Sequence, residues 1–194
     1  MKFSAFSRIA AAAALASACL VTWSPASAQA QLGGSQSQTL VWHRIFGIPE
    51  AFNVVGSGTG AVNGGAPWVT TSGNAKINLK KGTVSFNVKG LVLAVGGEAA
   101  VPISGLQIGT PAGVTEVKGT VVCAVSGVGN GGNSVLVDTP AVPLSSTGDA
   151  SFSGKVGPFP SACSTSDIAF LIRIVEPDGF ADLWIAAGGV LDPP

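Results

Sequence analysis

The stretch "AKINLKKGTVSFNVKGL", residues 75–91, decides the fold class of this chain. Apolar side chains occupy every second position on both sides of Lys81-Gly82, and polar side chains fill most positions between them. A period of two is typical of a β-strand with one buried face, because successive side chains of a strand point to opposite faces. Glycine adopts the positive φ that a tight connection needs. The stretch therefore predicts a β-hairpin whose two apolar faces lie on the same side of a sheet.

Short segments of the same kind recur along the rest of the chain, and the 27 glycines and 12 prolines leave few windows for a helix. In 168–175 the alternation places Phe170 and Ile172 toward the core and Arg173 outside. The last segment, 182–190, is apolar on both faces, as in a strand that is covered on both sides. We therefore predict an all-β fold: an antiparallel β-sandwich, with a closed β-barrel as the alternative. The predicted strands are 39–46, 75–79, 84–88, 115–125, 135–138, 149–156, 168–175 and 182–190.

The first 28 residues predict a signal peptide that is removed on export. Two basic residues precede an apolar run over 9–21, which is too short to span a bilayer. Small residues then allow cleavage after Ala28 or Ala30. Cys19 leaves open an alternative in which this cysteine is lipidated and anchors the protein to a membrane. The predicted location is outside the cytoplasm, in the periplasm, on the surface or in the medium.

After export the chain is short enough for one domain. Residues 31–38 predict a loose N-terminal lead, and residues 39–194 predict a single β domain. A chain of about 165 residues can form one core that buries roughly 70% of the surface exposed by the unfolded chain. Loss of Lys2 and Arg8 leaves eight basic residues against ten acidic ones. This balance argues against nucleic acid as a partner, because binding to a phosphate backbone needs clustered positive charge.

Two cysteines remain after export, Cys123 and Cys163. An oxidising compartment favours their pairing, so the sequence predicts a Cys123–Cys163 disulfide. Closing a loop of this length stabilises a fold by about 4 kcal/mol through loop-closure entropy.

Two glycine-rich stretches need interpretation. Gly56, Gly58 and Ala61 in "VVGSGTGA" have the spacing of a dinucleotide-binding fingerprint. That site also needs a buried strand before it, a helix after it and an acid about 20 residues on, and the sequence has none of these. We therefore expect a glycine-rich loop and no nucleotide. Residues 126–134, "SGVGNGGNS", predict a flexible turn.

No catalytic residue, metal site or cofactor is predicted. His43 is the only histidine, and its place in 39–46 indicates a strand residue beside Trp42. Three acids lie close together in "EPDGFAD", where a proline and a glycine indicate a turn between strands. They are the weak candidates for a calcium site: Glu176, Asp178 and Asp182.

The expected function is that of an exported, non-catalytic module, structural, adhesive or ligand-binding, with a cell-surface or polymer partner. Exposed tryptophans could bind a polymer by stacking, and Trp68, Trp184 and Trp42 are the candidates, although burial in the core is the more common role of such residues. Two alternatives remain. One is an exported hydrolase built on two carboxylates facing one pocket. The other is a fimbrial-type subunit that is completed by a neighbour's strand.

Overall fold

The structure is a computed structural model that describes residues 39–94, 107–164, 166–176 and 181–191. The predicted signal peptide, the lead at 31–38, Cys19 and Asp178 lie outside these residues. The described part of the chain contains no α-helix and one short 3₁₀ helix, η1 (Gly58–Gly60). The strands are β1 (Thr39–Gly47), β2 (Val54–Val55), β3 (Val62–Asn63), β4 (Trp68–Val69), β5 (Ser72–Asn78), β6 (Thr83–Lys89), β7 (Val92–Leu93), β8 (Glu116–Cys123), β9 (Val135–Asp138), β10 (Val142–Pro143), β11 (Ala150–Lys155), β12 (Ile168–Glu176) and β13 (Trp184–Leu191).

One antiparallel sheet holds most of these strands, in the order β10-β8-β12-β13-β1-β5-β6-β11, and β9 pairs with β8 beside β10. The predicted hairpin of residues 75–91 is confirmed: β5 pairs with β6, Ala75 lies opposite Phe86, and Gly82 has a φ of 66° in the turn. Pairs β2-β3 and β4-β7 form two small additional sheets. The described residues belong to one compact unit.

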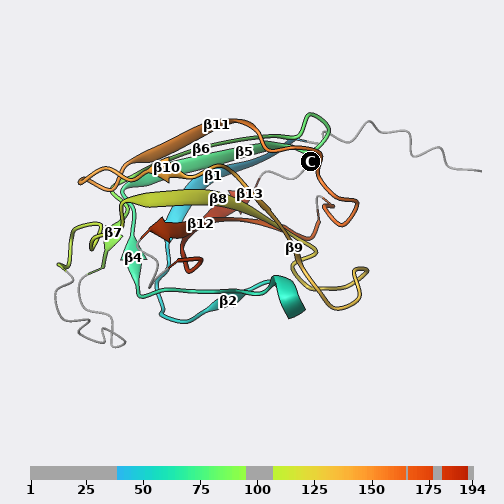
Figure 1. The fold of residues 1–194 in the computed structure, drawn as a ribbon, viewed down its shortest axis with the longest axis horizontal. Helices are drawn as coiled ribbons and strands as arrows, with labels where there is room; N and C mark the ends of the chain where they lie inside the picture. The colour runs from blue at the N-terminus through green and yellow to red at the C-terminus, as the bar shows by residue number, and fades with distance from the viewer. Residues whose placement is uncertain (1–38, 95–106, 165, 177–180, 192–194) are drawn as a thin grey trace, which may run out of the picture. The chain divides into compact units, whose positions relative to one another are not determined.

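The main sheet curls over its own core. Phe86 on β6 and Phe170 on β12 are four places apart in the sheet, which is about 19 Å in a flat sheet. Their ring centroids are nevertheless 5.7 Å apart, and Trp42 packs on Phe170 at 6.0 Å. One half of the sheet (β1, β5, β6, β11) therefore faces the other (β8, β12, β13), as Figure 1 shows. The all-β antiparallel prediction is confirmed, and the curl is consistent with a sandwich or a half-barrel.

Gly119 on β8 makes this close packing possible. A Cβ at this position would lie 2.9 Å from two ring carbons of Phe86 and 3.1 Å from Cε2 of Phe170. Because the two rings come from opposite halves of the sheet, the missing side chain lets the halves approach each other.

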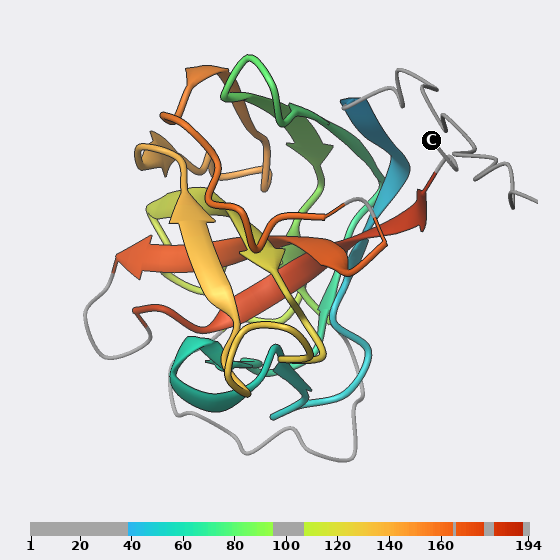
Figure 2. The same ribbon diagram turned by 90° about the vertical axis from the view of Figure 1, so that its right-hand side faces the viewer.

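A third layer covers the outer face of the β8-β12-β13 half. The chain from Ile48 to Trp68, which includes β2, η1 and β3, runs beneath these strands in both views (Figures 1 and 2). Ile48 N donates to Ile185 O, and Gly65 N donates to Trp184 O. Ile185 is buried completely, as predicted for a last strand that is covered on both sides.

The sheet stays open between β9-β10 and β11. β10 has only two residues, and Pro143 has no N–H to offer to a further strand. A tight turn from Ser145 to Asp149 leads from β10 into β11, with Gly148 N donating to Ser145 O. Within the described residues β11 pairs only with β6, so its other edge has no strand partner.

Candidate functional site

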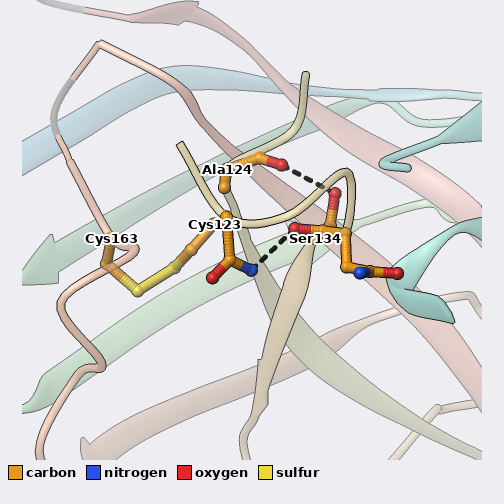
Figure 3. Close-up of a disulfide and its surroundings, with 6 residues drawn as sticks. Cys123, Ala124, Ser134 and Cys163 are labelled. Atoms are coloured by element: carbon orange, nitrogen blue, oxygen red, sulfur yellow. Dashed lines mark hydrogen bonds between the residues drawn. A yellow bond between two sulfur atoms is a disulfide. The ribbon is translucent and has the colours of Figure 1, made fainter. Parts of the chain in front are cut away.

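The disulfide is the first predicted site that the structure confirms. Cys123 and Cys163 are joined, with their Cα atoms 4.6 Å apart. Cys123 ends β8 and is fully buried, while Cys163 lies in the connection from β11 to β12 (Figure 3). The bond therefore fastens this connection to the end of β8, beside the open edge of the sheet.

The two glycine-rich stretches pack against each other. Ser57 N donates to Ser134 Oγ at 2.8 Å, and Ser134 N donates to Ser57 O at 2.9 Å. Ser134 Oγ in turn donates to Ala124 O next to the disulfide (Figure 3). A Cβ at Gly56 would lie 3.0 Å from Ser134 Oγ and 2.8 Å from the backbone oxygen of Gly60. The glycine spacing thus reflects close contact between two loops.

These contacts refine what the sequence indicated for both stretches. "VVGSGTGA" forms β2 and η1, without the α-helix that a dinucleotide site needs. Residues 126–134 form a turn, as predicted, but internal hydrogen bonds such as Gly132 N to Gly127 O hold it in place. The turn is fixed between β8 and β9 and against the η1 loop.

Four charged side chains form one network on the outer face of β8, β9 and β12. Arg173 Nη2 donates to Asp182 Oδ1 at 2.8 Å, and Arg173 Nη1 donates to Asp138 Oδ1 at 3.2 Å. Lys118 Nζ lies 2.9 Å from a carboxylate oxygen of each aspartate. Arg173 lies on the face away from the core, as predicted. It is nevertheless buried, with only 6% of its surface exposed.

The network shifts the pKa of two members. The hydrogen bond from Lys118 lowers the pKa of Asp182 below its ordinary value of 3.8; burial raises it, and the charges of Arg173 and Lys118 lower it further. Burial alone lowers the pKa of Lys118, but the hydrogen bonds to Asp182 and Asp138 outweigh burial, and the net shift is upward. Both shifts favour the charged forms at neutral pH.

Two of the three weak calcium candidates, Asp182 and Glu176, lie within the described residues. Asp182 presents its carboxylate to Lys118 and Arg173, whose positive charges occupy the place that a cation would take. Glu176 is exposed at the end of β12. Within the described ranges no three acidic, histidine or cysteine side chains are grouped to hold a metal ion.

The three tryptophans belong to the core. Trp42 is 2% exposed, Trp68 4% and Trp184 6%, so none offers a ring face for stacking. Trp184 Nε1 donates to Asn53 O in the covering layer. Trp42 packs on Phe170 inside the curled sheet, and Trp184 lies against the covering layer. The stacking surface proposed for these three residues is not present in the structure.

Two surface clefts are lined by residues that the structure describes. One, of about 270 Å³, lies between residues 43–46 of β1 and 70–73 at the start of β5. The other, of about 370 Å³, lies between β10 and the beginning of β11 and contains Asp149. Neither of these two clefts is lined by two acids, the arrangement that a carboxylate hydrolase needs.

The first cleft holds residues that the sequence reasoning missed. His43 lies in β1 beside Trp42, as predicted, and is exposed. Arg44 and Phe46, two and four residues after buried Trp42, also line the cleft. The signal was present: Arg44 stands at the period-two position after Leu40 and Trp42, where the alternation predicts a buried residue. The alternation breaks there, and the next buried residue is Ile45.

Comparisons with protein-family models, with curated protein sequences and with solved structures find no match to this chain. Within the described part of the chain, no helix is both long enough and apolar enough to cross a membrane.

Proposed function

We propose that this chain is an exported, non-catalytic β module that acts as a scaffold or binds a ligand. The observation that carries the proposal is the use of its aspartates. Asp138 and Asp182 are held by Lys118 and Arg173, Asp167 accepts from Ser126 N and Oγ, and Asp149 accepts from Gly90 N. All four aspartates that the structure describes thus fix strands and turns.

Export is supported by the disulfide and by the sequence of residues 1–28. Disulfides persist in oxidising compartments and are rare in the cytosol, so the Cys123–Cys163 bond is compatible with a location outside the cytoplasm. The many small and polar surface residues suit a durable exported protein.

Cell fractionation and an activity screen test this proposal. The producing cell is separated into cytoplasm, membranes, periplasm and medium, and the protein is located by antibody and its N-terminus by mass spectrometry. We expect it outside the cytoplasm, starting at Gln29 or Gln31. The purified protein is then incubated with a panel of ester, peptide and glycan substrates. Turnover that survives repeated purification and is lost in an aspartate variant would contradict the non-catalytic proposal, as would a cytoplasmic location with an intact N-terminus.

One observation favours a second candidate function, strand addition by a neighbouring subunit. The free edge of β11 could pair with an extended strand, which is a common mode of β-sheet recognition. The core beside this edge is filled, because Phe152 packs on Phe86 with a centroid distance of 6.3 Å. A neighbour's strand would therefore bind through backbone hydrogen bonds along the free edge of β11, without inserting side chains into the core. Light scattering of the purified chain from micromolar to millimolar concentration tests it: oligomers support strand addition, and a monomer throughout contradicts self-assembly.

A further inference from the structure

The cleft beside β1 exists because β1 and β5 separate. They pair from Thr39 opposite Asn78 to Trp42 opposite Ala75, and the pairing then stops. Beyond this point Thr70 Oγ1 donates to Ile45 O, so the two segments stay connected across the cleft. The cleft thus has a defined floor between two strands of the main sheet and is part of the folded framework.

Phe46 is one of the residues that line the cleft, and its ring lies over Gly189 of β13. Phe46 is 48% exposed, although the other end of β1 is buried in the core. Gly189 on β13 has no side chain, and the ring of Phe46 occupies the space that a Cβ would need there. The ring is therefore supported from below by the sheet and keeps one side open to solvent.

The polar groups of the cleft offer both acceptors and a cation. Thr70 and Thr71 donate their hydroxyl hydrogens to Ile45 O and Lys89 O, so their oxygens remain available as acceptors. The side chain of Ser72 forms no hydrogen bond within the described residues. Arg44 forms no ion pair there either, and its guanidinium can bind a carboxylate with two parallel hydrogen bonds.

We propose that this cleft binds one residue of an acidic polysaccharide, a sugar that carries a carboxylate. The apolar C–H face of the sugar packs on Phe46, its hydroxyl groups donate to Thr70 and Thr71, and its carboxylate pairs with Arg44. A small inorganic anion would use the arginine alone, and a neutral sugar would leave it unpaired, so the combination favours a sugar acid. This inference rests on the proposed function as a binding module and names its ligand class.

Calorimetry with two matched ligands tests the inference on the full mature chain. The probes are a tetramer of 1,4-linked galacturonic acid and the neutral tetramer of 1,4-linked galactose. We expect the acidic tetramer to bind at least tenfold more tightly. Arg44→Gln should weaken its binding at least tenfold, and Phe46→Ser should weaken it severalfold. Lys155→Gln on β11 removes the same charge far from the cleft and should leave binding unchanged.

The single histidine locates the bound sugar. His43 lines the cleft, so its imidazole proton resonances should shift on addition of the acidic tetramer to the wild-type protein and stay in place with Arg44→Gln. This readout needs only folded protein, which the dispersed methyl resonances verify in the same spectra. If Phe46→Ser fails to fold, Arg44→Gln still decides, because Arg44 is exposed and unpaired in the described structure.

Four outcomes overturn the inference: no binding at millimolar tetramer, equal binding of the neutral tetramer, equal loss with Lys155→Gln, or binding without a shift of the His43 resonances. Release of new reducing ends from the tetramer would refute the non-catalytic proposal and leave the ligand class standing. Absence of binding would refute the ligand class alone.

Discussion

Replacing Arg173 by methionine should destabilise the protein by about 2 kcal/mol. The side chain is only 8% exposed, and Nη2 and Nε bind Asp182 at 2.8 and 3.1 Å while Nη1 binds Asp138 at 3.2 Å. Methionine keeps an apolar stem of similar length, so the substitution removes mainly the charge and the hydrogen bonds.

The magnitude follows from the exposure of the partners. Hydrogen bonds to a charged group contribute about 1.5–3 kcal/mol each when they are buried. The Asp182 side chain is 64% exposed and that of Asp138 is 35% exposed, so water replaces much of what is lost, and exposed ion pairs contribute only about 0–1 kcal/mol. Lys118 also remains beside both carboxylates. The sum is about 2 kcal/mol, which corresponds to a fall in Tm of roughly 4–8 °C for a domain of this size.

Urea unfolding followed by tryptophan fluorescence measures the effect, because all three described tryptophans are buried. The control is Arg44→Met, which removes an exposed arginine of β1 that forms no ion pair within the described residues and should change stability by no more than about 0.5 kcal/mol. A double-mutant cycle of Arg173→Met with Asp138→Asn isolates the coupling between the two residues. If Arg173→Met equals the control or stabilises the protein, the network does not hold the outer strands and our reasoning is wrong.

Three further predictions concern other parts of the fold. The double variant Cys123→Ala/Cys163→Ala should lose about 4 kcal/mol in urea unfolding, because it frees a closed loop with a sequence separation of 40; a loss below 1 kcal/mol would contradict loop closure as the main effect. Asp182 has a folded pKa below its unfolded value, so its contribution is present above about pH 4 and is lost as the pH falls through the folded pKa. The stability difference between wild type and Asp182→Asn should therefore shrink between pH 5 and pH 2, and a constant difference would argue against the shift. Gly119→Ala should cost about 1–3 kcal/mol by overpacking against Phe86, and a rise in Tm would show that the rings can move aside.

Much of the fold could be predicted because its signals are local. The alternation in residues 75–91 specifies both strands of a hairpin, and Gly82 marks its turn. The same pattern placed Phe170 and Ile172 in the core. The disulfide was predictable for a different reason: if the predicted signal peptide is removed, two cysteines remain and only one pairing is possible.

The candidate site was less predictable, because burial on the outer face depends on distant segments. A period of two separates the faces of a strand but does not show what covers the outer one. Trp184 is buried because Asn53 and its neighbours lie against it, 131 residues earlier in the chain. The cleft beside Phe46 likewise arises from the place where β1 and β5 stop pairing.

The sequence by itself determined the strand pattern, the hairpin turn and the identity of the disulfide partners, since side-chain alternation, glycine geometry and cysteine count are properties of neighbouring or few residues. Only the tertiary structure decided that Arg173 is buried and that the sheet curls until Phe86 meets Phe170. Those outcomes depend on strand order and on contacts between segments far apart in the chain, where many arrangements satisfy the same local pattern and the packing of the whole core selects one.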